Sequence, residues 1–310
     1  MDSNIVDIVA NFLRADIRSA TPILLAAIGL VFMERSGVIN IGVEGMMLIG
    51  TLSAVIGSLY LGSAWMGVLV AMLSTGLIGL LFAFLVVTIR ANQVVVGMAI
   101  NILGIGLTTS LARIIFGLNM APPKIDTFKA YTIPVLSKIP VLGPALFNQM
   151  AIVYLALLLV PITHYLLFKT TIGLKVRAVG EHPKAADTVG INVFKVRYAS
   201  IVGGAMLSGV AGAYLSLGLL SFFSEGMVAG RGFIALAAVI FGKWSPIGAL
   251  GAALLFGAGD ALQIRMQAMG SSIPYQFLLM LPYILTVVAL AGFVGKSTPP
   301  AASGIPYTKE

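Results

Sequence analysis

The chain has 310 residues, of which 59% are hydrophobic and only 10% are charged, and its mean hydropathy is +1.03. Soluble globular domains carry about 25% charged residues, so these charges are too few to cover a water-facing surface and predict an integral membrane protein. The net charge of +8 does not indicate nucleic-acid binding, because the basic residues lie between apolar runs, as topology-setting charges do. The absence of cysteine excludes disulfides, thiolate metal sites and cysteine nucleophiles.

The uncharged runs at the beginning of the chain predict three membrane spans. About 20 helical residues cross a bilayer core of roughly 30 Å. A short first span is expected at about Ile17 to Met33, with Pro22 near its start and residues 3–14 as an interfacial helix. The uncharged run from Gly45 to Ile89 is long enough for two further spans, joined by a turn at residues 61–64.

Apolar runs continue through the rest of the chain. Further spans are predicted at Ala91–Ala112, Ile139–Phe168, Tyr198–Ser224, Trp244–Gly259 and Met266–Gly295. Residues 232–242 are apolar but too short to cross a bilayer, so they predict a half-helix or a tilted partner of the following span. We therefore expect an all-α fold, a polytopic transmembrane helix bundle of about 8–10 spans, which forms a single transmembrane domain over residues 1–310.

The charged segment 169–197 sets the predicted orientation. Lysine and arginine outnumber Glu181 and Asp187 in it, and the positive-inside rule makes it a cytoplasmic loop. Counting spans in both directions places the C-terminal tail, 297–310, inside and the N-terminus outside. The same count places the connection 117–148 outside, where its prolines predict an ordered external cap. These prolines are Pro122, Pro123, Pro134, Pro140 and Pro144.

Within the cytoplasmic loop, the residue pattern predicts one short helix. Pro183 suits the first helical position, and Gly190 suits the left-handed position just after a helix. A helix this short is marginal alone in water, so it is expected to dock on something. Ala185 and Ala186 would let its backbone lie deep in a groove on a partner. A solvated basic loop is the alternative, although it does not explain why start, stop and small residues coincide.

The pattern Ala185-Ala186-x-x-x-Gly190-Ile191 resembles the coupling loop of ABC importer permeases, in which a short helix inserts into the ATPase subunit. Three other segments resemble the nucleoside and simple-sugar group (branched-chain amino acid/ribose-like) of these permeases: Glu34–Gly45, Arg90–Gly97 and Gly230–Gly242. The resemblance implies that coupling to the ATPase is carried by Glu181, Pro183, Ala185, Ala186, Asp187 and Gly190. It also implies a multi-pass protein of the cell membrane, an ATP-binding subunit inside, a second permease that is often a longer paralogue, and a substrate-binding lipoprotein outside.

Polar side chains in the span after Arg90 are candidates for the translocation pathway. Gln93, Asn101 and Thr108 follow helical spacing and are expected to share one face. Amide groups both donate and accept hydrogen bonds, which suits a nucleobase or a ribose. Hydrogen bonding between helices is the alternative for this face. Phe222, at a predicted outer turn, is a candidate for stacking on a base, with an interfacial aromatic belt as the alternative.

The acidic stretch Glu34–Glu44 also combines charge with glycine near membrane depth. Ionisable residues there mark a pathway or a satisfied ion pair, so pairing of Glu34 with an arginine, substrate contact and a cytoplasmic interface all remain open. Asp260, five residues before Arg265, predicts a helix-end pair rather than a proton site.

No catalytic residues are predicted, because no nucleophile, base and orienting group can be assembled. The only histidines, His164 and His182, make an improbable metal pair. Gly295-Lys296-Ser297 lacks the first glycine of a phosphate-binding loop, because position 290 is leucine. We therefore expect no cofactor in this chain, with ATP-Mg hydrolysed by a partner.

The sequence as a whole favours the permease subunit of an ABC importer that moves nucleosides by alternating access. The alternatives are a simple-sugar (ribose-like) or branched-chain amino acid permease, an ion-coupled secondary transporter, and a non-transporting membrane scaffold or enzyme.

Overall fold

The computed structural model describes residues 3–117, 125–134, 136–269, 274–280, 284, 288 and 297–309. Seven helices in these ranges are long and apolar enough to cross a membrane. They are α1 (Ser3–Arg35), α2 (Val43–Leu61), α3 (Ala64–Ala83), α4 (Gln93–Phe116), α6 (Ala151–Lys169), α9 (Val193–Tyr214) and α11 (Pro246–Ala268). The predicted all-α polytopic bundle is confirmed.

The other elements are short and connect or cover the spanning helices. A π-helical turn extends α3 over Phe84–Thr88 and α9 over Leu215–Leu219. The remaining elements are β1 (Ala130–Thr132), a 3-10 turn (Leu136–Lys138), α5 (Leu142–Leu146), β2 (Asn148–Met150), α7 (Thr171–Glu181), α8 (Pro183–Thr188), α10 (Arg231–Phe241) and α12 (Tyr275–Leu279). The half-helix predicted at 232–242 is present as α10.

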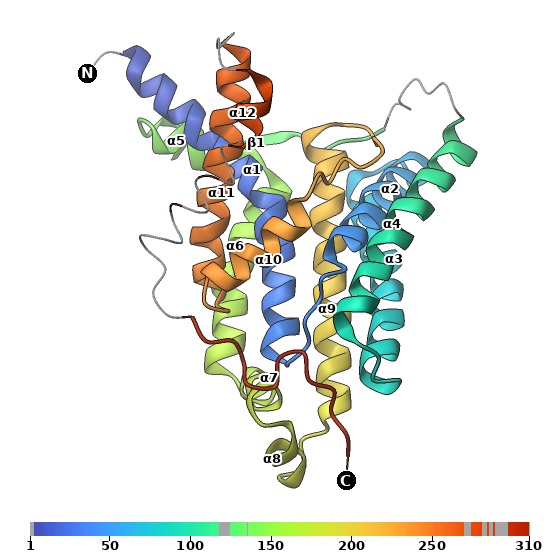
Figure 1. Ribbon diagram of the computed structural model, residues 1–310. Coiled ribbons are helices and arrows are strands. Elements are labelled where there is room, and N and C mark those ends of the chain that lie inside the picture. Colours follow the sequence, from blue (N-terminus) through green and yellow to red (C-terminus); the bar gives the residue numbers. More distant parts are fainter. Residues whose placement is uncertain are drawn as a thin grey trace.

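Helix α1 lies at the centre of the bundle, where it packs against α9, α10 and α11 (Figure 1). All its residues from Ile23 to Val31 are buried. A helix that is apolar and buried on every side is a core helix. By contrast, α3, α4 and α6 present many large apolar side chains outward, which a membrane protein covers with lipid or with another subunit.

The first span differs from its prediction. Instead of a short span preceded by a separate interfacial helix, α1 runs without interruption from Ser3 to Arg35 and contains Pro22. Pro22 has no N–H to donate to the carbonyl of Arg18. Beside that carbonyl, the Thr21 hydroxyl binds the carbonyl of Ile17 at 2.7 Å. Such hydroxyl groups and close helix packing allow proline inside membrane helices, so the helix continues.

Two later spans also have different limits from those predicted. In the run Ile139–Phe168, only α6 spans, because residues 139–150 fold into the turn, α5 and β2. Helix α11 continues past Gly259 to Ala268 because Asp260 is paired within the bundle, with Arg231 at 3.6 Å, and not with Arg265. The predicted last span, Met266–Gly295, lies largely outside the described residues, so the described part of the chain holds seven spans rather than 8–10.

The two ends of the bundle carry different connections. The N-terminus, β1 and α5 lie at one end, whereas α7, α8 and the C-terminal tail lie at the other (Figure 1). This separation agrees with the predicted sidedness, in which the loop 169–197 and the tail are cytoplasmic. In the described residues of the predicted cap, β1 pairs antiparallel with β2, and Phe128 packs edge-on against Trp65 with ring centroids 5.0 Å apart. Pro122 and Pro123 of the predicted cap lie outside the described residues.

Candidate functional site

The predicted start and end of the short cytoplasmic helix are both found in α8. Pro183 occupies its first turn, and Gly190 follows it with φ +84°. The amide of Gly190 donates to the carbonyl of Asp187 at 2.9 Å, and the amide of Ile191 donates to Ala186 at 3.0 Å, so the turn after the helix satisfies its last carbonyls. Together with α7, this helix lies at the end of the bundle that carries the C-terminal tail, where α8 is the outermost helix (Figure 1).

The two alanines of α8 face different environments. Ala185 is exposed, whereas Ala186 is only 3% exposed and packs against Val179, Val193 and Tyr307 of the same chain. Since α8 is attached to its own chain through Ala186, the surface it offers to a partner is built around Ala185 and the 75%-exposed Val189. Ala186 is therefore not available to insert into a groove on a partner, whereas Ala185 is.

The two predicted acidic coupling residues contact the C-terminal tail. The Oε2 atom of Glu181 accepts a hydrogen bond from the amide of Ala301 at 3.2 Å. The carboxylate of Asp187 lies 3.9 Å from the Nζ atom of Lys309. The sequence contained no periodic or motif signal for this arrangement, because the tail is more than a hundred residues away along the chain.

The three polar side chains predicted to share one face of α4 do lie together on its buried side. Gln93, Asn101 and Thr108 are all buried, with 3%, 6% and 2% of their surfaces exposed. The Asn101 side chain accepts from the amide of Gly45 at 2.8 Å and donates to the carbonyl of Ile41 at 3.0 Å. These bonds satisfy backbone groups near the beginning of α2. A role of this face in the translocation pathway stays a prediction.

The other two side chains of that face use their polar groups differently. The Oε1 atom of Gln93 accepts from the amide of Ile39 at 2.8 Å, and its buried Nε2 atom has no hydrogen-bond partner among the described residues. The Thr108 hydroxyl binds the carbonyl of Gly104 on its own helix at 2.7 Å. Gln93 therefore retains a free donor inside the bundle, whereas Thr108 does not need a ligand.

Replacement of Asn101 by Ala is expected to destabilise the bundle by about 2–4 kcal/mol, because it leaves a buried N–H and a part-buried carbonyl unpaired. Thr109→Ala on the same helix is the control, because that side chain is only partly buried. The midpoint of thermal aggregation in lipid nanodiscs, without substrate, measures the difference. Equal midpoints for both variants would contradict the structural role of Asn101.

The stretch Glu34–Glu44 contains two carboxylates, one at the end of α1 and one in the first turn of α2, that bind α10 and the turn after it. Glu44 is 8% exposed, and its two oxygens accept from the amides of Gly230 and Gly232 at 2.8 and 2.7 Å. Because these amides open α10, Glu44 caps a helix that begins inside the bundle. Glu34 binds the indole Nε1–H of Trp244, so the pairing of Glu34 with an arginine is wrong.

Two arginines that were not singled out in the sequence hold the same region together. Arg35 donates from Nε to the carbonyl of Trp244 at 2.8 Å, beside the Glu34 contact. Arg197 is only 1% exposed and donates from Nε to the carbonyl of Ser36 at 3.2 Å. Both bonds join segments more than 150 residues apart, which no local pattern could have indicated.

Phe222 lies half-buried in the segment between the π-helical turn of α9 and α10. Nearby, Glu225 binds Arg113 at the end of α4, with an N–O distance of 2.9 Å. The Arg113 hydrogen bond lowers the pKa of the Glu225 carboxyl below its ordinary value. The contribution of this pair is therefore present at neutral pH and lost as the pH falls through that lowered pKa. Stacking of Phe222 on a base stays a prediction.

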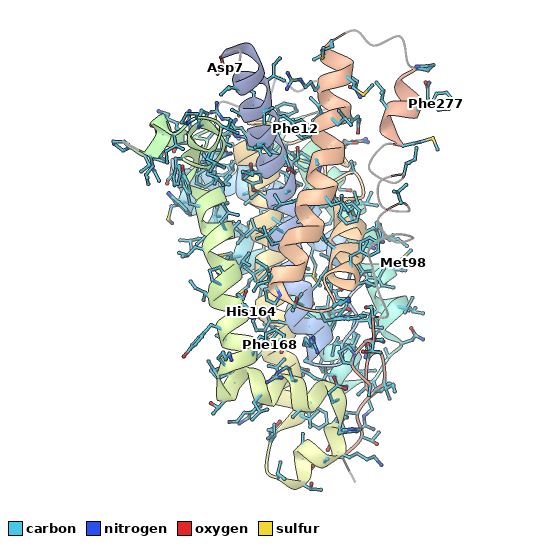
Figure 2. The ribbon with its side chains drawn as sticks, turned by 90° about the vertical axis from the view of Figure 1, so that its left-hand side faces the viewer. Asp7, Phe12, Met98, His164, Phe168 and Phe277 are labelled. Atoms are coloured by element: carbon cyan, nitrogen blue, oxygen red, sulfur yellow. The ribbon has the colours of Figure 1, made fainter. Side chains whose placement is uncertain are left out.

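The two histidines lie in separate environments. Figure 2 places His164 about one helical turn from Phe168 on α6, and the two ring centroids are 4.8 Å apart. His182 precedes α8. Among the described residues, no three His, Asp or Glu side chains form a group that would hold a metal ion.

Comparison with known proteins identifies the family. The family described as branched-chain amino acid transport system / permease component matches residues 15–290. The guanosine ABC transporter permease protein NupQ of Bacillus subtilis is 42% identical, over 99% of this chain and 99% of the relative. The nucleoside ABC transporter permease protein NupC of Lactococcus lactis is 40% identical, over 97% of this chain and 96% of the relative.

A third relative is named for the transport of a different substrate. The putative glucose ABC transporter permease protein TsgC13 of Haloferax volcanii is 40% identical, over 84% of this chain and 79% of the relative. No solved structure matches. A family match over most of the chain, together with relatives of nearly equal length, agrees with the seven apolar spans of the bundle, and the chain therefore belongs to this family of ABC-transporter permease components.

Proposed function

We propose that this chain is the membrane-spanning subunit of an ATP-driven importer that carries nucleosides into the cell. The observation that carries the proposal is the full-length similarity to two permeases named for guanosine and nucleoside transport. The predicted absence of a phosphate-binding loop agrees with a subunit that uses ATP-Mg hydrolysed by its partner.

In this proposal, substrate passes beside the buried polar face of α4. The free Nε2 donor of Gln93 is the group that binds a base or a ribose when the bundle opens. Asn101 and Thr108 line the same pathway farther along α4, and Phe222 offers a ring near the outer end. The second permease, a longer paralogue, covers part of the exposed apolar surface of α3 and α4. A binding lipoprotein delivers the substrate at the end that carries the N-terminus and the cap.

Uptake of labelled substrates tests the proposal. Cells that lack this chain are expected to lose guanosine uptake and to regain it when the gene is restored. ATP depletion is expected to abolish the restored uptake, and uptake that persists without ATP would contradict an ATP-driven importer. A simple sugar is the second candidate, because one 40% identical relative is named for glucose. Loss of sugar uptake with intact guanosine uptake would replace the substrate and leave the permease role unchanged.

In the proposed importer, α8 is the contact through which ATP hydrolysis drives the bundle. Replacing the exposed Ala185 by Glu is expected to reduce substrate-stimulated ATP hydrolysis at least tenfold, because the charge is buried where the ATPase subunit docks. The change leaves the packing of Ala186 intact. Measurement uses the purified complex in nanodiscs.

A matched control is Thr298→Glu, which places the same charge on an exposed residue of the C-terminal tail outside α8. This variant is expected to hydrolyse ATP at the rate of the unmodified complex. If Ala185→Glu also hydrolyses ATP at that rate, α8 is not the contact that couples hydrolysis to transport.

A further inference from the structure

The C-terminal tail lies along the cytoplasmic end of the molecule, beside α7 and α8 (Figure 1, dark red). It is attached there by backbone hydrogen bonds to two distant parts of the chain. The amide of Ala302 donates to the carbonyl of Gly180 at 2.9 Å, and the amide of Gly304 donates to the carbonyl of Gly37 at 3.1 Å. The tail thus connects the end of α7 with the segment that leads from α1 to α2.

A buried arginine fixes the same segments from the inside. Arg197 on α9 donates from Nε to the carbonyl of Ser36 and from Nη1 to the carbonyl of Ile305 at 3.1 Å. A buried cation needs hydrogen-bond acceptors to offset its loss of water. Because one acceptor belongs to the tail, the tail is part of the folded core of this end and not an appendage.

Side chains of the tail also complete the packing under α8. Tyr307 is 6% exposed and forms one apolar cluster with Val179, Ala186 and Val193. Its ring meets Phe194 edge-on at 5.5 Å. The position of α8 relative to α9 therefore depends on a tail residue.

Between α8 and the tail lies a groove of about 470 Å³. Residues 181–185 form one wall, and residues 301–302 and 305–308 form the other. Its lining is mainly apolar, and Ile305 is 56% exposed. The loop 169–197, which contains α8, is predicted by its excess of Lys and Arg to lie in the cytoplasm, so this groove faces water rather than lipid tails. An apolar groove in water is typical of a surface that binds another protein.

We propose that residues 300–309 are the second wall of the ATPase docking site, so that an apolar segment of the ATPase subunit binds between α8 and Ile305. This inference rests on the proposed coupling role of α8 and extends it. The tail is hydrogen-bonded to Gly37, and the carbonyl of Ile305 is hydrogen-bonded to Arg197. A movement of the docked ATPase subunit is therefore transmitted directly to the segment between α1 and α2. That segment holds Gln93, through the amide of Ile39.

The test compares Ile305→Asp with Thr298→Asp in the intact complex. Ile305 lines the groove, whereas Thr298 is an exposed tail residue outside it. Ile305→Asp is expected to weaken binding of the ATP-binding subunit to the nanodisc-embedded permease at least tenfold, because a charge enters an apolar contact. Thr298→Asp is expected to bind normally. Normal binding by Ile305→Asp would overturn the inference.

A second measurement does not depend on a disruptive substitution. A photoreactive amino acid at position 305 is expected to cross-link to a protein that mass spectrometry identifies as the ATP-binding subunit, and the same group at position 298 is not. Cross-linking from 305 to lipid or to a second permease alone would overturn the inference.

Ala185→Glu separates this inference from the proposed function. If Ala185→Glu weakens ATPase binding but Ile305→Asp does not, the tail is not part of the docking site and the role of α8 stands. If neither substitution weakens binding, both the role of α8 and that of the tail are wrong. If both substitutions weaken binding of the ATP-binding subunit, the result supports a docking groove formed by α8 and the tail together.

Discussion

Replacing Glu44 by Ala is expected to destabilise the bundle by about 2–4 kcal/mol, because one buried and one part-buried backbone N–H group lose their acceptor. The two carboxylate oxygens of Glu44 accept from the amides of Gly230 and Gly232, which open α10. A carboxylate suits this place, since the N-terminus of a helix carries a partial positive charge.

Water cannot easily replace the lost carboxylate on the Gly232 side. A methyl group built on Gly232 would lie 2.7 Å from the Cα of Glu44, so the two backbones are in direct contact. Arg231, the first residue of α10, does not compete for Glu44, because Asp260 on α11 pairs with it at 3.6 Å. The cap is therefore specific to Glu44, and its loss is expected to loosen α10 from α2.

The midpoint of thermal aggregation in lipid nanodiscs measures this effect. Glu44→Gln is expected to lie between the unmodified protein and Glu44→Ala, because the amide oxygen retains one acceptor while its NH₂ group faces a second N–H. Glu225→Ala is the matched control, since its carboxylate is half-exposed and pairs with Arg113 at the surface, where ion pairs contribute little. An unchanged midpoint for Glu44→Ala would contradict the capping role.

Features that depend on neighbouring residues were predictable from the sequence. The turn at residues 61–64 joins α2 and α3 where the apolar run was long enough for two helices. The limits of α8 follow from Pro183 and Gly190, because proline fits a first turn and glycine tolerates a positive φ. The half-helix α10 follows from the length of its apolar run alone.

Features that depend on distant residues were not predictable in this way. The sequence offered an arginine as the partner of Glu34, but folding brings Trp244 to it across 210 positions. Ala185 and Ala186 were predicted to have the same role, whereas only Ala186 is buried, against Tyr307. Both outcomes depend on which distant segments meet at the end of the bundle that carries α8 and the tail. Local patterns in a single sequence do not contain that information.

The predicted helix lengths were too short where a charged residue has its partner on a distant segment. The first span was predicted to begin only near Ile17, next to Arg18, and Asp260 was predicted to lie at a helix end. In the folded chain, Arg18 binds Gln149 at 3.0 Å and Asp260 binds Arg231. A charge with a partner on another helix does not need to lie at the end of its own helix, so both helices are longer than their uncharged runs.

The second large effect is expected at Gly104, where Ala should destabilise the bundle by about 3 kcal/mol, because backbone meets backbone. A methyl group there would lie 2.6 Å from the Cα of Gly45 and 2.7 Å from its carbonyl oxygen. Neither atom can move unless α4 separates from α2. That separation would also stretch the 2.8 Å bond from the amide of Gly45 to Asn101, so the polar face of α4 would lose its order.

Gly106 supplies the matched control on the same helix, because a methyl group built there has no atom within 4 Å. Gly106→Ala is expected to leave the thermal midpoint in nanodiscs unchanged or slightly higher, since alanine favours a helix over glycine by roughly 0.5–1 kcal/mol. Small residues let membrane helices approach closely, and only one of these two glycines is used for that purpose. Equal losses from both substitutions would mean that the flexibility of α4, and not its contact with α2, determines the stability of this helix pair.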